Sequence, residues 1–494
     1  MNILFQNFNK MTFRIFIILI LFINILKSQN FSQKIFPNDP KQGAYFGRFV
    51  AQNDNYLVIS AYKDFGKASS SGSLFIFQNK NGQYVQTQKI FPEDGTVEQF
   101  FGYSIGINND WIITGAHHDS SKGASSGAAY ILKNVNTNEW RISQKLVPDD
   151  LSEADEFGKK VDLYGQFAVS SSYLDDDFGI NSGSVYIFKL DSSGYWHKFS
   201  KIYASTPAKY SQFGLSVDLF KDKLIVGAPF EGNKEFGSAY IFEFINNNWV
   251  ETAKLIPEGL NEFDQFGITV KVNDDFAFVS SIKDDDLGEN SGTVYVFKKR
   301  QTGWKYSQKL KAPDGAEGDG FGIDIELSDS IAIIGSYFDD DKGQNSGSIY
   351  FFQLKNDKWR FQKKLTADDG EESDAFGSSI SLKGDNLLVG AYSDSDEGFL
   401  AGSAYVFSLK KALKTKEITG RTRVFPSVIY NLLTIESEYS KFQIKLYDIN
   451  GNIYKNLFSN KSNIIFSLKE LPKGLYFISI NSKRHLETFK IVKF

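Results

Sequence analysis

The chain of 494 residues contains no cysteine. This absence excludes disulfides, thiolate zinc sites, a cysteine nucleophile and a lipid-modified cysteine anchor. Methionine (2) and proline (10) are scarce, and the net charge is only −4, which gives no indication of a nucleic-acid partner. Phenylalanine (46), tyrosine (24) and glycine (41) are plentiful instead. This balance favours strands and tight turns over helices.

The N-terminus has the pattern of a secretory signal peptide. Lys10 and Arg14 precede the apolar run "IFIILILFINIL", and the small residue Ser28 follows it. A basic segment, a short apolar segment and a small residue are typical of a cleaved signal, and the run is short for a membrane-spanning helix. We therefore expect residues 1–28 to be a signal peptide. An uncleaved anchor is the alternative, and either Met1 or Met11 would serve as the start.

Seven copies of the dipeptide Phe-Gly form a regular series, about 55 residues apart. The copies begin at Phe46, Phe101, Phe157, Phe213, Phe266, Phe321 and Phe376. Each copy contains four short segments rich in β-branched and aromatic residues, bounded by Gly, Asn, Asp or Ser, which are strand signals. A four-stranded unit repeated seven times predicts an all-β fold, a seven-bladed β-propeller over residues 29–409.

One strand signature is displaced in a way that favours a closed ring. The fourth segment of a repeat ends in "QKI" or "QKL", as at Gln88 and Gln144. The seventh repeat lacks this segment, and the missing copy, "SQKIFPNDP" from Ser32, precedes the first repeat. We expect the N-terminal strand to complete the last blade, because ring closure leaves few unpaired strand edges.

These motifs resemble FG-GAP repeats. Phe-Gly opens the first strand, "VGA" or "ISA" ends the second, and "SGSxYxF" forms the third. The resemblance implies the seven-bladed propeller found in integrin α subunits and in many bacterial surface proteins. In that family, calcium binds a D-x-D-x-D-G loop between the first and second strands, but here that connection is too short to hold such a loop.

After Phe407 the repeat stops. Residues 410–421 are polar and basic and are predicted to form a linker, and residues 422–494 form a small all-β unit, predicted to be a β-sandwich, with a hairpin signal at Asn450-Gly451. "FPSVIYNLLTI", "LYDINGNIY", "LKELPKGLYFISI" and "KIVKF" resemble the C-terminal sorting domain of type IX secretion in Bacteroidota, although Pro426-Ser427 replaces the usual Asn-Pro. The resemblance implies the type IX secretion machinery as a partner and a secreted or cell-surface location.

Three acidic stretches join the second and third strands of their repeats: "DDDFGINSG", "DDDLGENSG" and "DDDKGQNSG". In antiparallel blades these loops share one face, called the acidic face below, with the loops that join one repeat to the next. Asp and Asn oxygens suit Ca²⁺. The candidate calcium ligands are Asp175, Asp176, Asp177, Asn181, Asp284, Asp285, Asp286, Asn290, Asp339, Asp340, Asp341 and Asn345. The alternative is a purely structural loop, in which Asp and Asn bond the local backbone.

The sequence offers little sign of catalysis. His117 and His118 occur in one repeat only and are interpreted as a surface pair rather than a zinc site, and no nucleophile-elbow or phosphate-loop motif is present. The expected function is non-enzymatic binding or adhesion by a monomeric, exported propeller, with a protein or glycan ligand on the acidic face. A secreted hydrolase built on the same ring is the alternative.

Overall fold

The computed structural model describes residues 31–136, 139–232, 234–413, 422–425, 428–429, 432–437, 441–461, 463–482 and 485–493. The chain divides into two compact units, Met1–Leu413 and Lys414–Phe494. The signal peptide expected at 1–28 and most of the expected linker lie outside the described residues. None of the helices in the described part of the chain has the length and apolar character needed to cross a membrane.

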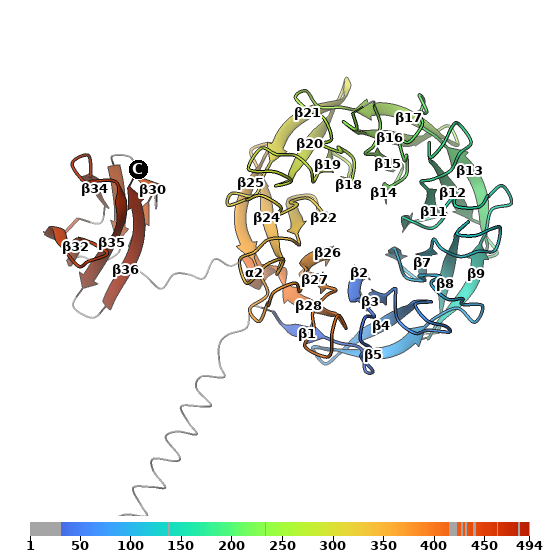
Figure 1. Ribbon diagram of the computed structural model, residues 1–494, viewed down its shortest axis with the longest axis horizontal. Coiled ribbons are helices and arrows are strands. Elements are labelled where there is room, and N and C mark those ends of the chain that lie inside the picture. Colours follow the sequence, from blue (N-terminus) through green and yellow to red (C-terminus); the bar gives the residue numbers. More distant parts are fainter. Residues whose placement is uncertain are drawn as a thin grey trace, which may run out of the picture. The chain divides into compact units, whose positions relative to one another are not determined.

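The first unit is a ring of seven antiparallel sheets with four strands each (Figure 1). The strands follow in sequential order in six of the sheets, and the seventh takes its outer strand from the N-terminal segment. The first strand of each sheet lies nearest the centre, and the fourth lies at the outside. The fold therefore matches the predicted seven-bladed propeller.

Blades 1 to 4 have the following strands. Blade 1 comprises β2 (Phe46–Gln52), β3 (Tyr56–Ala61), β4 (Ser73–Lys80) and β5 (Gln83–Ile90). Blade 2 comprises β6 (Ile105–Asn108), β7 (Trp111–Ala116), β8 (Ala128–Asn136) and β9 (Glu139–Leu146). Blade 3 comprises β10 (Val161–Tyr164), β11 (Phe167–Ser172), β12 (Ser184–Leu190) and β13 (Trp196–Ile202). Blade 4 comprises β14 (Ser216–Phe220), β15 (Lys223–Ala228), β16 (Ser238–Ile245) and β17 (Asn248–Leu255).

Blades 5 to 7 complete the ring. Blade 5 comprises β18 (Val270–Val272), β19 (Phe276–Ser281), β20 (Thr293–Arg300) and β21 (Gly303–Leu310). Blade 6 comprises β22 (Ile325–Leu327), β23 (Ile331–Ser336), β24 (Ser348–Lys355) and β25 (Lys358–Leu365). Blade 7 comprises β26 (Phe376–Lys383), β27 (Asn386–Ala391), β28 (Ser403–Ser408) and the N-terminal strand β1 (Gln33–Ile35).

The predicted ring closure is confirmed. Strand β1 pairs antiparallel with β28, with Lys34 opposite Tyr405, so the two ends of the propeller sequence share one sheet. The side chain of Gln33 then reaches blade 1, where Nε2 donates to the carbonyl of Tyr84 (2.8 Å) and Oε1 accepts its N–H (2.7 Å). The N-terminal segment therefore holds blade 7 together and joins it to blade 1.

The hydrophobic core lies between neighbouring blades. Second strands such as β11 are buried along their whole length, because both faces of each sheet are covered by another blade. The aromatic residues near the start of the fourth strands fill these spaces: Trp140 packs edge-on against Tyr56 of the preceding blade, with ring centroids 5.4 Å apart. The tryptophans of the fourth strands are therefore packing residues.

Glycine allows the loops of adjacent blades to touch. A Cβ added to Gly183, in the third blade's "NSG", would lie 2.1 Å from the carbonyl oxygen of Phe213, the Phe-Gly residue of the next repeat. Its φ of 81° also favours glycine. The same approach occurs at Gly347 and Phe376, again at 2.1 Å. The two repeated dipeptides, Ser-Gly and Phe-Gly, therefore form one contact between consecutive blades.

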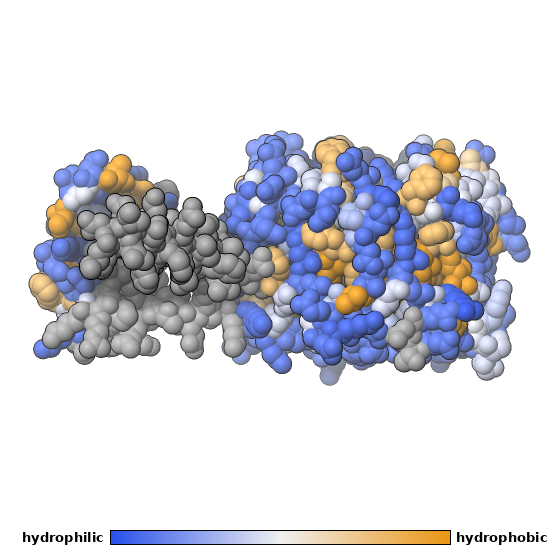
Figure 2. Space-filling view, turned by 90° about the horizontal axis from the view of Figure 1, so that it is seen from below, coloured by the Kyte–Doolittle hydropathy of each residue, from blue (hydrophilic) through white to orange (hydrophobic). Residues whose placement is uncertain are grey.

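Helix α2 (Leu409–Leu413) follows β28. Ala412 is buried against blade 7, and its carbonyl accepts a hydrogen bond from Lys363 Nζ at 2.7 Å. The expected linker therefore starts later than residue 410, because its first turn belongs to the propeller. The wall of the ring shows apolar residues between two largely hydrophilic rims (Figure 2).

The second unit has two sheets around one core, as expected for a sandwich. One sheet contains β29 (Thr422–Phe425), β31 (Leu432–Ser437) and β34 (Asn463–Ser467). The other contains β30 (Val428–Ile429), β36 (His485–Lys493), β35 (Gly474–Ser482), β32 (Phe442–Asp448) and β33 (Ile453–Ser459). The Asn450-Gly451 turn joins β32 to β33, with Gly451 at a φ of 85°, which confirms the predicted hairpin.

Candidate functional site

The three aspartates of each acidic loop have three different roles. In blade 3, Asp175 is buried, and its carboxylate accepts hydrogen bonds from the Asp177 N–H (2.9 Å) and the Ser184 hydroxyl (3.0 Å). Asp176 is exposed and accepts the N–H of Asn181 at 2.6 Å, which closes the loop. Asn181 has a φ of 51°, a conformation that asparagine tolerates well.

The loops of blades 5 and 6 repeat this arrangement. Asp284 and Asp339 are buried, Asp285 and Asp340 accept the N–H groups of Asn290 and Asn345 at 2.7 Å, and both asparagines have positive φ. Consecutive aspartates therefore do not converge on one point. The first points into the blade, the second bonds the local backbone, and the third, Asp286 or Asp341, turns toward a lysine.

That lysine stands one residue before the end of the fourth strand, as in "QKI" or "QKL" and in the variant "SKI" of blade 3. In blade 3, Lys201 Nζ lies 2.6 Å from Asp175 Oδ2 and 2.7 Å from Asp177 Oδ2. Burial alone would lower the pKa of Lys201, but the two carboxylates and Tyr186 raise it well above its usual value. The ammonium group is therefore a permanent cation between the first and third aspartates.

Every blade contains this lysine–carboxylate pair. The pairs are Lys89–Asp64, Lys145–Asp119, Lys201–Asp175, Lys254–Glu231, Lys309–Asp284, Lys364–Asp339 and Lys34–Asp394, with Nζ–O distances of 2.6 to 2.8 Å. The seventh lysine comes from β1, so ring closure also supplies the cation of blade 7. Lys34 contacts Asp396 as well, at 2.6 Å, in the corresponding loop of blade 7.

The glutamine of the same signature links neighbouring blades. Gln144 at the end of β9 donates to the Trp196 carbonyl (2.7 Å) and accepts the Trp196 N–H (3.0 Å) in blade 3. Gln308 makes the same pair of bonds with Trp359. Both residues of the "QK" signature are therefore explained by the scaffold: glutamine joins two blades, and lysine neutralises the loop of its own blade.

These contacts bear on the calcium prediction. The loops share a face with the loops that join the blades, as expected, since the Ala154 N–H bonds the Ala124 carbonyl (2.9 Å). A count of loop charges alone overstates the acidity of that face, because the lysines that end the fourth strands lie among the carboxylates. Calcium binding stays a prediction, and the ion would have to displace an ammonium group from the first and third aspartates.

A different set of side chains gathers on the inner rim of the acidic face. It occupies the positions just before Phe-Gly, just after it, and just after the second strand. Seven half-buried rings form what we call the aromatic arc, which runs over blades 6, 7, 1, 2 and 3: Tyr337, Tyr392, Tyr45, Tyr62, Phe100, Tyr103 and Tyr173. Blades 4 and 5 have Pro229 and Ile282 where four of the other blades have tyrosine, so the rim is not symmetric.

Neighbouring rings of the arc are in contact across blade boundaries. Tyr45 stacks on Tyr62 (centroids 5.8 Å apart) and lies 5.7 Å from Tyr392 of blade 7. Tyr62 meets Tyr103 of blade 2 edge-on at 5.4 Å, and Tyr392 lies 6.2 Å from Tyr337 of blade 6. Burial raises the pKa of Tyr62 to about 12, so its phenol is a neutral hydrogen-bonding group at physiological pH.

Three cations accompany these rings. Arg48 lies over Tyr392 (4.8 Å from the ring centroid), Lys63 over Tyr45 (4.9 Å) and Lys159 over Tyr103 (4.6 Å). Cation–π contact holds each long side chain beside a ring while its charge can still attract an anion. The arc therefore combines flat apolar faces, phenol hydroxyls and positive charge.

The backbone that presents two of the rings is unusual. Tyr45 has a φ of 57° and Phe100 a φ of 59°, although bulky side chains rarely adopt this conformation. The same position is Gly320 in blade 6, where the conformation has no steric cost. The residues at this position in the other four blades also have positive φ, so the conformation belongs to the repeat, and only the choice of an aromatic side chain differs between blades.

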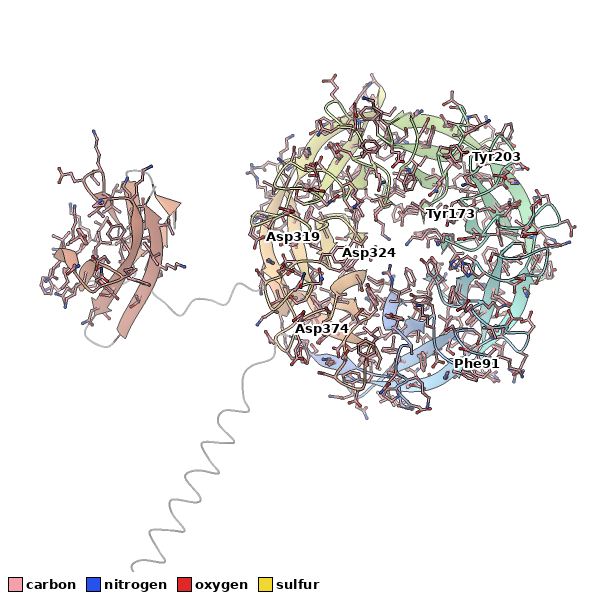
Figure 3. The ribbon with its side chains drawn as sticks, in the orientation of Figure 1. Phe91, Tyr173, Tyr203, Asp319, Asp324 and Asp374 are labelled. Atoms are coloured by element: carbon pink, nitrogen blue, oxygen red, sulfur yellow. The ribbon has the colours of Figure 1, made fainter. Side chains whose placement is uncertain are left out.

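Charged side chains on the innermost strands join the blades near the ring centre, where Figure 3 shows Asp324. Asp162 accepts the N–H of Leu219 in the next blade at 2.8 Å, and Asp218 accepts that of Val272 at the same distance. Burial, with the nearby charge of Asp218, raises the pKa of Asp162 to about 7. These carboxylates satisfy edge-strand N–H groups and are explained by the scaffold.

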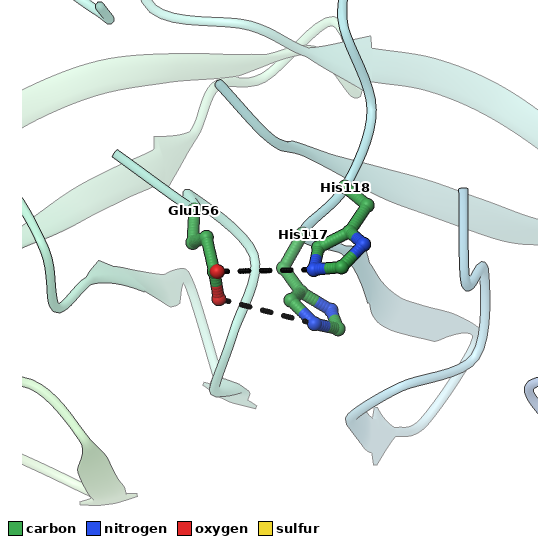
Figure 4. A group of neighbouring side chains, drawn as sticks. All are labelled: His117, His118 and Glu156. Atoms are coloured by element: carbon green, nitrogen blue, oxygen red, sulfur yellow. Dashed lines mark ion pairs between the residues drawn. The ribbon is translucent and has the colours of Figure 1, made fainter. Parts of the chain in front are cut away.

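Besides the aromatic arc, the sequence analysis did not predict the surroundings of the histidine pair. His117 and His118 follow β7, and Glu156, at the position before Phe157-Gly158 of blade 3, faces both (Figure 4). His117 is only 3% exposed, so the interpretation as a surface pair is wrong for this residue. Burial, together with Lys159 and His118, holds the pKa of His117 well below its usual value.

The aromatic arc and the histidine pair both lie at positions where the sequence departs from the repeat, and this departure is the signal that could have identified them. The position after the second strand carries tyrosine or histidine in five blades but Pro229 and Ile282 in the other two. Which of these side chains meet is set by the ring, since the contacts cross blade boundaries.

Comparison with known protein families identifies both units. The FG-GAP repeat model matches residues 30–77, 84–132, 140–188, 196–242, 249–297, 304–352 and 359–407. A secretion system C-terminal sorting domain matches residues 423–493. This second match indicates export by type IX secretion to the cell surface or the extracellular space, as the sequence predicts.

Comparison with individual proteins adds less. No match was found among curated protein sequences. Among solved structures, a putative 6-phosphogluconolactonase from Bacteroides uniformis is similar, with 13% sequence identity and a TM-score of 0.47, covering 84% of this chain and all of that one. That likeness carries no argument about activity. The seven repeat matches span most of the sequence, so the chain belongs to the FG-GAP repeat family and ends in a type IX secretion sorting domain.

Proposed function

We propose that this exported propeller is a non-enzymatic binding protein whose ligand site is the aromatic arc. The observation that carries the proposal is the asymmetric rim: four blades place a half-buried tyrosine after the second strand, where blades 4 and 5 have Pro229 and Ile282. Three cations lie over the rings of the arc. A scaffold requirement would recur in all seven blades, as the lysine–carboxylate pairs do. Residues present in only some blades therefore point to a ligand.

The chemistry of the arc favours an acidic glycan. Tyrosine faces suit the apolar face of a sugar ring, and their hydroxyls suit its polar edges. Arg48, Lys63 and Lys159 add positive charge that a carboxylated or sulfated sugar would meet. The site lies on the face where a glycan or protein partner is expected from the sequence.

A glycan array tests the proposal. The propeller alone (residues 31–413) is suitable, because it forms one compact unit with its own core. We expect binding to carboxylated or sulfated glycans that falls at least tenfold in Tyr62→Ala and Tyr392→Ala. Tyr195→Ala is the control, since this half-exposed tyrosine lies in a loop between third and fourth strands, on the opposite face.

Two results would redirect the proposal. Binding that is unchanged in both arc variants would place the ligand elsewhere on the ring. Release of shortened glycan products during incubation would support the alternative, a secreted hydrolase.

A further inference from the structure

Among the residues that the structure describes, one group of three histidine or carboxylate side chains brings its ligand atoms within 4.8 Å of one another: His117, His118 and Glu156. Two ring nitrogens and a carboxylate form a ligand set that suits transition metals rather than calcium. The acidic loops do not form such a group in the described part of the chain, because their aspartates point in different directions.

The geometry of the group is close to that of an ion site. His117 Nε2 lies 3.9 Å from Glu156 Oε2, and His118 Nε2 lies 3.7 Å from Glu156 Oε1. These distances are too long for hydrogen bonds. Two ligand atoms of a tetrahedral zinc ion lie about 3.3 Å apart, since each bond is about 2.0–2.1 Å. The three ligand atoms lie within 4.8 Å of one another, so the side chains would have to move closer together to close the site around an ion.

The backbone explains how two adjacent histidines reach the same point. Successive side chains of a strand point to opposite faces, but β7 ends at Ala116, just before the pair. The two imidazoles turn to one side, with ring centroids 4.4 Å apart. Glu156 reaches them from the start of blade 3. Its backbone φ is 50°, like that of the aromatic residues at the same repeat position.

A second observation concerns the buried ring. The Nδ1 atom of His117 is buried without a hydrogen-bond partner. Burying a polar group without a partner costs free energy. The hydrogen bonds of this residue therefore do not explain why a histidine occupies the position. A metal bond through Nδ1, in place of Nε2, would satisfy this atom.

Two neighbours modulate the carboxylate. The Tyr173 hydroxyl donates to Glu156 Oε2 at 2.9 Å, an outer contact that orients a ligand toward a metal. Lys159 Nζ lies 3.4 Å from the same oxygen and would compete with a metal cation. The site is also accessible, because the His118 side chain is 34% exposed.

We propose that His117, His118 and Glu156 bind one divalent transition-metal ion, with Zn²⁺ the best match, at the blade 2–blade 3 junction of the inner rim. Two histidines and one glutamate would leave a fourth position for water. This site is separate from the acidic loops and does not depend on the proposed glycan.

Titration of the metal-free mature chain with Zn²⁺ tests the proposal directly, with binding followed by calorimetry and by the melting temperature. We expect one tight equivalent per chain and a higher melting temperature with Zn²⁺, but no such effect with Ca²⁺ or Mg²⁺. His118→Ala should weaken binding at least 100-fold without unfolding the chain, because the side chain is partly exposed. His197→Ala is the matched control, since this exposed histidine bonds Asp191 in a loop on the opposite face.

Two further variants separate a metal site from adventitious histidine binding. Tyr173→Phe should weaken Zn²⁺ binding about tenfold through the lost outer contact. Lys159→Met should strengthen it, because the competing ammonium group is gone. Cobalt(II) should give a visible spectrum typical of low coordination that disappears in His118→Ala. Equal zinc affinity in the wild-type chain and His118→Ala, or weaker binding in Lys159→Met, would overturn the proposal.

Discussion

The acidic face has two regions, the loops between second and third strands and the inner rim, and their residues recur around the ring in different ways. The loops between second and third strands carry the most conspicuous motif of the sequence. In every blade, however, one carboxylate of this loop is paired with a lysine of the same blade. The inner rim has no motif, but its residues differ from blade to blade. In a repeat protein, a feature present in every unit serves the common scaffold, whereas a feature confined to some units is free to serve a ligand.

The largest expected effect comes from removing the N-terminal strand, residues 31–37. This deletion removes Lys34 and leaves the buried carboxylate of Asp394 without its cation, while also exposing the edge of β28. We expect a loss of at least about 5 kcal/mol of stability, since an uncompensated buried charge alone costs about 3–5 kcal/mol. The thermal melting of the propeller measures it, and a truncated chain that melts with the full-length protein would contradict the ring-closure role.

Replacing one of the lysines that end the fourth strands should destabilise the propeller for the same reason, by a smaller amount. Lys364 contacts Asp339, Asp341 and Asp314, and Lys364→Met would leave the buried Asp339 unpaired. We expect a loss of about 3 kcal/mol. Lys342→Met, an exposed lysine in the same loop, is the control and should change stability by less than about 0.5 kcal/mol. Equal effects of the two substitutions would remove the distinction between scaffold and surface charge.

Replacing a tyrosine of the aromatic arc should reduce ligand binding more than it reduces stability. Tyr392→Ala removes a ring that contacts Tyr45, Tyr337 and Arg48. We expect about 2 kcal/mol of ligand binding to be lost, which is about 30-fold in Kd, as for aromatic residues at the centre of an interface. The melting temperature should fall less than in Lys364→Met. If stability falls more than binding, the arc is packing and not a ligand site.

The pH dependence of stability probes the loops that connect the blades. Burial raises the pKa of Asp319 to about 6, against the Ala316 N–H, which bonds its carboxylate and lowers the pKa. The folded state therefore holds this proton more tightly than the unfolded chain, in which the pKa is near 3.8. The contribution of Asp319 to stability is consequently greatest at low pH and falls as pH rises from about 4 to 6.

Asp319→Asn keeps a hydrogen-bond acceptor and removes this cost. We expect the variant to be about 1–2 kcal/mol more stable than the wild-type chain at pH 8 and nearly equal to it at pH 4. Denaturant unfolding at the two pH values measures the difference. A variant that is destabilised equally at both values would show that the carboxylate is needed in its charged form.

The smallest expected effect concerns calcium. Lys309 occupies the position between Asp284 and Asp286, so calcium should raise the melting temperature of the wild-type chain little. Lys309→Met leaves the buried Asp284 without its cation, while Asp286 keeps its contact with Lys311 at 2.8 Å. We expect millimolar Ca²⁺ to restore part of the stability that this variant loses. Lys89→Met is the control, because its loop has one carboxylate for the lysine, Asp64. A larger calcium shift in the wild-type chain than in Lys309→Met would support a metal site that coexists with the lysine.

The repeat made most of the architecture predictable. Seven Phe-Gly dipeptides, the displaced "QKI" segment and the C-terminal motifs gave the blade number, the closure by β1 and the sorting domain, because each depends on a local pattern repeated along the chain. The start of the linker was less predictable. The segment at 410–413 is basic in sequence but packs Ala412 on blade 7, which a charge pattern alone does not reveal.

The sequence by itself therefore determined the units of this protein: the strands, their number, the ring and the export domain. Tertiary structure alone decided which charges meet. The register that places Lys201 opposite Tyr186 brings its ammonium group into a loop formed many residues earlier, so a motif that suggests a metal site becomes an internal ion pair. Likewise, His118 and Glu156 are 38 residues apart and face each other only because consecutive blades place their loops side by side at the inner rim.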